Sequence, residues 1–158
     1  LERLTTWVVV DSDALMPDIP SEQSERVCGL CKSLGVKFYQ LRRRAIENYL
    51  PPSAIQAWAL ERRSQRWPAF EAFMALTSQQ RHHFNMKSGL LGDADRAEPH
   101  KLTLYQTLSD QRRTALRNGF GQTANRFESR PFSEEHLRRD ESWSEMNPQM
   151  TSLIAALR

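Results

Sequence analysis

Two aspartates follow a short run of valines near the start of the chain. Residues 8–10 are β-branched valines of the kind that fill a buried strand of a parallel sheet, and Asp11 and Asp13 come directly after them. Ligands collect at the carboxyl ends of strands in open α/β sheets, and side chains two apart on an extended chain point the same way. Carboxylate oxygens suit Mg²⁺ or Mn²⁺. The pair therefore predicts either a divalent-cation site or a surface turn with two solvated aspartates.

A third carboxylate and a cluster of arginines follow the next expected strand. Glu47 comes soon after Leu41, where that strand ends, so it can approach the two aspartates and complete an acidic pocket. The alternative is that Glu47 pairs with Arg43 or Arg44 near the start of a short helix. Arg42, Arg43 and Arg44 are consecutive. Such a cluster either contacts nucleic-acid phosphates or forms a solvated face.

The elements that must position these side chains form a strand–helix–strand unit. A strand is expected over 5–10, a helix over 21–34 with an apolar stripe, and a second strand over 36–41. The stripe consists of Val27, Leu30, Cys31 and Leu34. A right-handed crossover between parallel strands is the default for such a unit. Two strands are too few for a stable sheet, so further strands are expected from upstream sequence or another chain.

From residue 44 onward the pattern is helical. Helices are expected over 44–49, 52–66, 68–76, 78–84, 102–108, 109–118, 133–139 and 144–157. Pro68 is expected in the first turn of its helix, and 88–99 is expected to be a loop. The residues expected to form the core of this part are Trp58, Trp67, Phe70 and Phe73. The fold class is α/β: a partial parallel sheet over 1–50, followed by a helical annex over 51–158.

The composition is that of one domain with a mild excess of basic residues. The 158-residue chain has a formal net charge of +3, which is compatible with a polyanionic partner and does not require one. No apolar run is long enough to span a membrane and no signal peptide is visible, so a cytoplasmic protein is expected. Cys28 and Cys31 form a lone CxxC, interpreted as two ordinary helix residues in a reducing compartment.

The two acidic segments together resemble the second half of a Toprim domain. The segments are VVVDSD at 8–13 and RRAIENYL at 43–50. They are most similar to Toprim nucleases fused to ATPases in the overcoming-lysogenisation-defect (OLD) family and related bacterial anti-phage proteins. In that family an early strand of a parallel sheet ends in a glutamate, a later strand ends in Asp-x-Asp, and a further glutamate follows the next strand. The resemblance implies a partial Toprim-like sheet here.

The same resemblance implies a metal-dependent nuclease. Asp11 and Asp13 match the family's Asp-x-Asp, and Glu47 matches the later glutamate. Lys87 is similar to the family's downstream active-site lysine. In such a site the carboxylates hold one or two Mg²⁺ or Mn²⁺ ions for phosphodiester hydrolysis, and the lysine stabilises the transition state. The arginines at 42–44 would hold the backbone of the nucleic acid, with DNA the expected substrate ahead of RNA.

Two parts of the family pattern are missing from this sequence. The family's first glutamate belongs well upstream of Trp7, and Glu2 is too close to the first strand to supply it. No GxxxxGK[ST] motif of an ATPase occurs. The chain therefore resembles the C-terminal part of a larger protein or one subunit of a split one, with an ATPase upstream or in trans that forms a homo-oligomer. The alternative function is a non-catalytic Toprim-derived module that docks nucleic acid or a partner ATPase.

Overall fold

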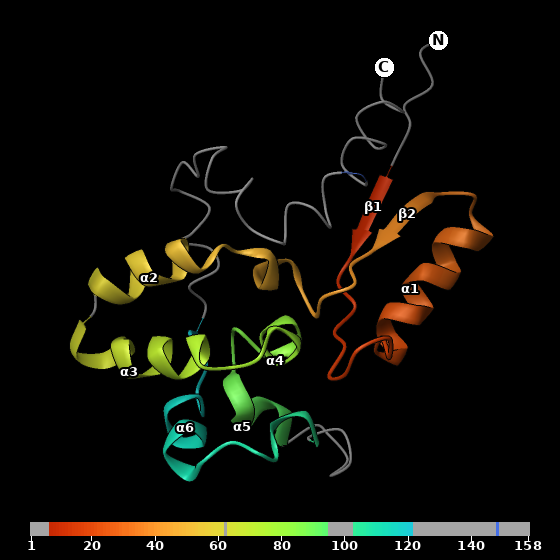
Figure 1. The fold of residues 1–158 in the computed structure, drawn as a ribbon. Coiled ribbons are helices and arrows are strands. Elements are labelled where there is room, and N and C mark those ends of the chain that lie inside the picture. The colour runs from red at the N-terminus through yellow and green to blue at the C-terminus, as the bar shows by residue number, and fades with distance from the viewer. Residues whose placement is uncertain (1–6, 62, 95–102, 122–147, 149–158) are drawn as a thin grey trace.

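In the part of the chain that the structure describes, a small parallel sheet lies at one side and most of the other elements are helices (Figure 1). The computed structural model describes residues 7–61, 63–94, 103–121 and 148. The elements in chain order are β1 (Trp7–Val10), α1 (Glu22–Ser33), β2 (Lys37–Gln40), the 3-10 helix η1 (Ile46–Tyr49), α2 (Pro52–Glu61), α3 (Arg63–Met74), α4 (Ser78–His83), α5 (Gly89–Ala94) and α6 (Asp110–Ala115). None of the helices in these ranges is long and apolar enough to cross a membrane.

Strands β1 and β2 form a two-stranded parallel sheet, which confirms the expected strand–helix–strand unit. Val10 pairs with Gln40 in the register, and the Gln40 Nε2 donates a hydrogen bond to Ser24 Oγ of α1 at 2.7 Å. Helix α1 therefore covers the face of the sheet that carries Val10. Because neighbouring residues of a strand face opposite sides, Val9 belongs to the other face, where it is 50% exposed. The sheet is thus covered on one face only by the residues that the structure describes.

Helix α1 packs on the sheet through a different face from the one its sequence predicts. Its buried residues are Ser24, Cys28 and Cys31, and both cysteines are free thiols. Of the expected apolar stripe only Cys31 is buried, so that part of the prediction was wrong. The residues of the stripe that stay exposed are Val27, Leu30 and Leu34. A sheet of two strands is narrow, so it covers the helix face with Cys28 and Cys31 and does not extend to the face with Val27 and Leu30.

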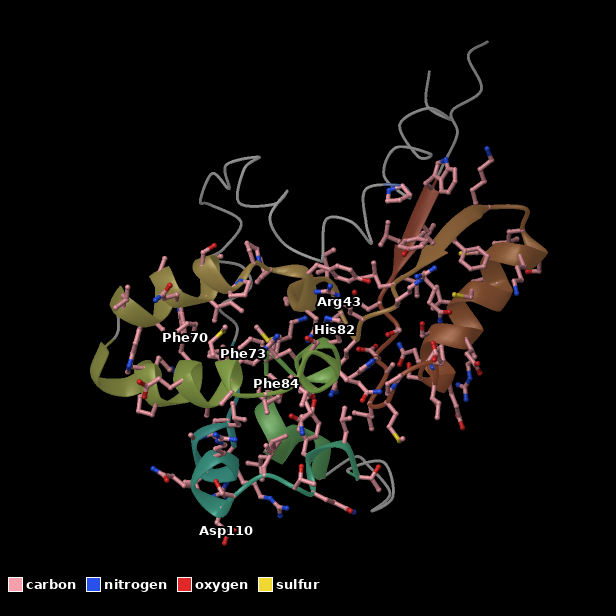
Figure 2. The ribbon with its side chains drawn as sticks, in the orientation of Figure 1. Arg43, Phe70, Phe73, His82, Phe84 and Asp110 are labelled. Carbon is pink, nitrogen blue, oxygen red and sulfur yellow. The ribbon has the colours of Figure 1, made fainter. Side chains whose placement is uncertain are left out.

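The main hydrophobic core lies in the helical annex. Phe120, in the turn after α6, is 1% exposed and forms edge-on contacts with Trp58 and Phe73, at ring-centroid distances of 5.7 and 5.4 Å. Phe70 and Phe84 are also buried among these helices (Figure 2). The expected aromatic core is confirmed, except that Trp67 is only partly buried at its margin. The core therefore depends on packing of α2 and α3 against the turn that follows α6.

The break between the second and third helices falls earlier than expected. Helix α2 ends at Glu61 and α3 begins at Arg63, so Pro68 lies inside α3 and not in its first turn. A proline inside a helix removes one main-chain hydrogen bond. Burial of Phe70 and Phe73 on the same helix offsets that loss, because large aromatic side chains contribute several times more than one hydrogen bond.

The expected loop over 88–99 is wrong in its first half, where α5 forms. The main-chain N–H groups of Leu90 and Leu91 donate to the carbonyls of Leu116 and Arg117, at 3.1 and 2.9 Å. These bonds satisfy donors at the start of α5 that a helix cannot satisfy itself. Because their acceptors lie far along the chain, no local sequence pattern reveals them. The expected helix over 102–108 is reduced to a 3-10 turn at 103–105, and the helices expected over 133–139 and 144–157 fall outside the described residues, apart from the helical residue 148.

Two glycines allow α5 to approach the end of α6 this closely. Gly89 and Gly119 both have positive φ, at +63° and +53°. A Cβ atom on Gly89 would lie 2.1 Å from the main-chain nitrogen of Gly119 and 2.3 Å from the Leu116 carbonyl oxygen. The contact therefore excludes every side chain at this position.

Candidate functional site

One pocket contains all four residues that the sequence nominates for catalysis. Asp11, Asp13, Glu47 and Lys87 line a pocket of about 230 Å³. The other residues that line it are Arg44, Ala45, Asn48, Phe84, Asn85, Met86 and Ser88. The lining comes from both sides of residue 50, so the first part of the helical annex supplies one wall of the pocket.

Asp11 lies at the end of β1 and contacts the start of η1. Its Oδ1 accepts a hydrogen bond from the main-chain N–H of Ile46 at 3.0 Å. Burial raises the pKa of the Asp11 carboxyl, and the nearby charges of Glu47 and Asp13 raise it further. The Ile46 N–H and the Lys87 ammonium act in the opposite direction without cancelling the rise. Asp11 therefore occupies a place where negative charge is poorly compensated by the protein.

Asp13 reaches the pocket by a turn and not along an extended strand. Strand β1 ends at Val10, and Asp13 has a φ of +48°, in the left-handed region. Its main-chain N–H donates to the Arg44 carbonyl at 2.7 Å, and the buried Ser12 hydroxyl donates to the Arg43 carbonyl at 2.8 Å. The expected extended Asp-x-Asp geometry is therefore wrong. Hydrogen bonds to the segment after β2 hold the two aspartates at the same pocket.

Glu47 is the most deeply placed carboxylate of the pocket. Its residue is 7% exposed, and its Oε1 forms an ion pair with Lys87 Nζ at 2.8 Å. Its Oε2 is buried and has no hydrogen-bond partner within the described part of the chain. A buried carboxylate oxygen is unfavourable without a partner, so a water or a cation in the pocket would stabilise it. The ion pair raises the pKa of Lys87, so this half-exposed lysine stays protonated.

The three arginines expected to bind nucleic acid lie in three different environments. Arg42 is exposed and Arg44 lines the acidic pocket. Arg43, labelled in Figure 2, is only 5% exposed. Its guanidinium lies 4.6 Å from the centre of the Tyr49 ring and donates to the Asn48 carbonyl at 2.9 Å. This placement does not agree with a phosphate contact by Arg43, because its charged group is enclosed by η1. Arg42 and Arg44 remain placed for that role.

Two residues that the sequence did not nominate hold the walls of the pocket together. The buried Nδ1 of His83 in α4 lies 3.2 Å from the Ala14 carbonyl oxygen, next to Asp13. Burial lowers the pKa of His83, so the ring is neutral and its Nδ1–H donates to that carbonyl. The buried carboxamide of Asn48, beside Glu47, also bonds to main-chain groups. Asn48 belongs to the segment at 43–50 that resembles the Toprim family, but its role is visible only from its hydrogen bonds to residues far along the chain.

The carboxylates of the pocket are of the ligand type that a hard divalent cation prefers, but they are not closely grouped. Within the residues that the structure describes, no three His, Cys, Asp or Glu side chains are grouped closely enough to hold a metal ion. Mg²⁺, however, is commonly held by one or two carboxylates and several waters. The unpartnered Glu47 Oε2 and the poorly compensated Asp11 provide such a pair. These two residues would hold the ion, with Asp13 beside them at the exposed rim.

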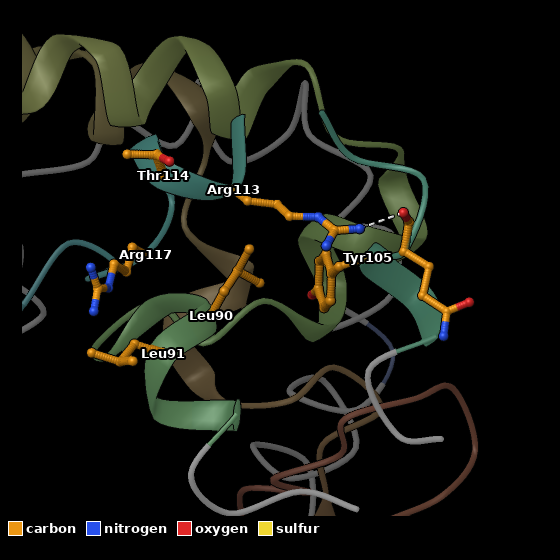
Figure 3. A pocket seen from close by; sticks show the side chains of 7 residues that line it. Leu90, Leu91, Tyr105, Arg113, Thr114 and Arg117 are labelled. Atoms are coloured by element: carbon orange, nitrogen blue, oxygen red, sulfur yellow. Dashed lines mark hydrogen bonds between the residues drawn. The ribbon is translucent and has the colours of Figure 1, made fainter. Parts of the chain in front are cut away.

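A second pocket has a different chemical character. It has a volume of about 350 Å³ and lies between α5, the turn at 103–105 and α6 (Figure 3). Its lining includes Leu90, Leu91 and Tyr105, together with the arginine Arg113, whose Nη2 donates to the Gln106 carbonyl. No carboxylate is present among the described residues that line it. Of these two pockets, only the first is therefore acidic.

Comparison with protein-family models, curated proteins and solved structures found no match to this chain. The Toprim resemblance consequently depends on the two acidic segments and Lys87.

Proposed function

We propose that this chain carries part of the catalytic site of a metal-dependent nuclease of the Toprim type, found in bacterial anti-phage proteins that combine a nuclease with an ATPase. The observation that supports this most is the acidic pocket, where Asp11, Asp13 and Glu47 meet Lys87. The substrate is the phosphodiester backbone of DNA, with RNA as the second candidate. An ATPase upstream or in trans, assembled as a homo-oligomer, would complete the protein.

The acidic residues have the task of holding Mg²⁺ or Mn²⁺ against the substrate. Asp11 and Glu47 would bind the ion, and Asp13 would bind one of its waters or a second ion. When bound, the ion supplies Lewis-acid stabilisation of the phosphate and lowers the pKa of a water. Without the metal ion the three carboxylates would repel the negatively charged nucleic acid. Binding of the nucleic acid at this pocket therefore requires the metal ion.

The basic residues have the task of orienting the phosphate. The ammonium of Lys87 lies beside Glu47 and is kept protonated by it. From there it can stabilise negative charge that develops on the phosphate, or donate a proton to the leaving oxygen. Arg44 at the pocket and the exposed Arg42 would contact neighbouring phosphates. Contacts of this kind fix the position of a strand without reading its bases, so cleavage should show little sequence specificity.

A plasmid-nicking assay with Mg²⁺ or Mn²⁺ tests this function, using the chain together with its upstream part. Asp13→Ala should abolish cleavage. Asp18→Ala is the matched control, because Asp18 is also exposed and also has a positive φ, of +58°, but does not line the pocket. Loss of cleavage in the first variant alone would support the nuclease. Equal activity in both variants would contradict the proposed site.

The alternative is a module that docks nucleic acid or an ATPase without cutting. It is favoured by the spacing of the carboxylates within the described residues, which does not group three of them around one point. Under this alternative the assembled protein leaves both DNA and a structured RNA intact, yet still retains one of them in a filter-binding assay. Binding that persists in Asp13→Ala and is lost when Arg42 and Arg44 are replaced by alanine would then assign the contacts to these arginines.

A further inference from the structure

The side chain of Asn48 is buried, and its hydrogen bonds to the described part of the chain all go to main-chain groups. The residue is 7% exposed and lies next to Glu47 in η1. Its Oδ1 accepts from the Ala45 N–H at 3.1 Å. Its Nδ2 donates to two carbonyls, those of Arg81 and Phe84, each at 2.9 Å. Both N–H groups of the carboxamide and one acceptor position are therefore used.

These hydrogen bonds join the two segments that carry Glu47 and Lys87. The acceptors lie at the end of α4, and Lys87 follows a few residues later in the chain. The ring of Phe84 is fully buried in the core of the annex, so the carbonyl that Asn48 reaches is anchored. The Asn48 carbonyl in turn accepts from Arg43 Nη1 at 2.9 Å. The segment with Glu47 is thus bound from two sides.

The Glu47–Lys87 ion pair cannot hold this geometry by itself. The Glu47 side chain is only 8% exposed, but that of Lys87 is 55% exposed, so solvent reaches the ammonium and screens its attraction to the carboxylate. The 3-10 helix η1 has four residues, and such short helices depend on contacts outside themselves. The main-chain contacts of Asn48 are therefore the stronger constraint on where Glu47 lies relative to Lys87.

We propose that Asn48 is a positioning residue that sets the separation of Glu47 and Lys87 across the acidic pocket. The effect of Asn48 on cleavage rests on the proposed function of the pocket. Its effect on the positions of Glu47 and Lys87 rests on the hydrogen bonds alone. Loss of the two Nδ2 donors removes two of the hydrogen bonds between the Glu47 turn and the end of α4 and leaves the one from the Arg44 N–H to the His82 carbonyl. The turn is then held less firmly, so Lys87 spends less time paired and the ion loses part of its fixed site.

Gln80 provides the matched control for a purely structural role. It is also buried, at 6% exposure, and its carboxamide also bonds to main-chain groups. Its Oε1 accepts from the Thr77 N–H at 3.0 Å and its Nε2 donates to the Leu104 carbonyl at 2.8 Å. Gln80 does not line the acidic pocket. Alanine at Asn48 and at Gln80 removes the same type of contact, at the pocket and away from it.

The first measurement does not depend on catalysis. The protein is labelled briefly with N-hydroxysuccinimidyl acetate, and acetylation of each lysine is followed by mass spectrometry, with Lys32 and Lys37 as internal references. Asn48→Ala should raise the labelling rate of Lys87 roughly two- to fivefold, the range that loss of an exposed ion pair produces, and Gln80→Ala should leave it unchanged. Asn48→Ser retains one donor, so its Lys87 labelling rate should lie between those of the native protein and Asn48→Ala. It replaces Asn48→Ala in the experiment if the alanine variant melts below the assay temperature. Equal Lys87 labelling in the Asn48 and Gln80 variants would overturn the proposal.

The second measurement connects Asn48 to the proposed nuclease. Binding of Mn²⁺ is followed by electron paramagnetic resonance, and cleavage is followed with the assembled protein. Asn48→Ala should weaken Mn²⁺ binding and lower kcat more than it changes KM for DNA, while Gln80→Ala changes neither. If the native protein neither binds Mn²⁺ nor cuts, the nuclease proposal fails, and the lysine labelling still decides the role of Asn48. If the native protein cuts and Asn48→Ala cuts equally well, the positioning role fails and the nuclease proposal stands.

Discussion

Asp11 is a carboxylate whose charge the protein compensates poorly. Its burial and the proximity of Glu47 and Asp13 raise its pKa, and one main-chain N–H and Lys87 offset this only in part. A raised carboxyl pKa means that the charged form is disfavoured in the folded state, so Asp11 lowers stability at neutral pH. Like charges placed together at such a cost to stability are a feature of sites that bind ions or perform catalysis.

Asp11→Asn should therefore stabilise the metal-free protein. Asparagine retains an oxygen to accept the Ile46 N–H and removes the negative charge. The melting temperature should rise by roughly 1–3 °C, a small change because solvent screens a partly exposed carboxylate. Thermal melting with and without Mg²⁺ measures this effect. Mg²⁺ should raise the melting temperature of the native chain and not that of the variant, and a lower metal-free value in the variant would contradict the argument.

At the scale of the elements, α4 connects the helical annex to the acidic pocket through His83. The neutral ring donates to the Ala14 carbonyl, and burial keeps the His83 pKa below its ordinary value of 6.5. Arg44 and Arg43 also oppose protonation of the ring, while Asp18 and the Ala14 carbonyl favour it. Because the unfolded chain takes up this proton first, His83 contributes full stability above pH 6.5 and loses it as the pH falls toward the lower pKa of the folded state.

The free energy of unfolding should accordingly decrease between pH 6.5 and about 5, above the range where most carboxylates titrate. Urea denaturation across this range measures the slope. His83→Gln should flatten the slope, because glutamine does not titrate. A slope unchanged in His83→Gln would show that another group causes it.

The contact between α5 and the end of α6 depends on Gly89. Alanine there would place a methyl group 2.1 Å from the main chain of Gly119, at a φ of +63°. Gly89→Ala should lower the free energy of unfolding by at least about 2 kcal/mol, since both the backbone conformation and the packing must change. Gly35→Ala is the control, because Gly35 has a similar φ of +67° with open space around it and should lose only about 1 kcal/mol. Urea denaturation of both variants measures the difference. Similar losses in the free energy of unfolding would mean that the strain of a positive φ, and not the close packing, causes the effect.

Elements with local signals were predictable, and elements that depend on distant partners were not. The valines of β1 and the serine cap before α1 indicate a strand and a helix by themselves. The first N–H groups of helix α5 bond to the carbonyls of Leu116 and Arg117, which are distant in the sequence. Which face of α1 is buried depends on how the helix packs against the two strands. Among the site residues, the motifs nominated the acidic residues and Lys87. Burial of Arg43 and the roles of Asn48 and His83 depend on contacts across the chain that spacing does not reveal.

At the scale of the whole molecule, the sheet and the helical annex depend on each other. The Arg44 N–H donates to the His82 carbonyl, and Asn48 donates to the carbonyls of Arg81 and Phe84. A two-stranded sheet is marginal in water without further packing. A chain that ends at Leu50 loses all of these acceptors together with one wall of the pocket.

Truncation after Leu50 should therefore yield an unfolded polypeptide. Far-UV circular dichroism and the dispersion of amide resonances in an NMR spectrum measure this directly, with the 158-residue chain as the reference. A truncated chain with native-like dispersion would contradict the argument and would define 1–50 as an independent domain.

Phe84 has a consequence for how this protein responds to heat. Its ring is fully buried among the aromatic residues of the annex, 5.6 Å from the Phe73 ring between centroids, while its carbonyl accepts the amide of Asn48 beside Glu47. One residue therefore belongs to the core and to the frame of the pocket. Local opening near the pocket would have to disturb the hydrophobic core of the annex, so the pocket and the core should open together as one cooperative unit. If the pocket is the proposed nuclease site, its activity should be lost only over the temperature range in which the whole chain unfolds.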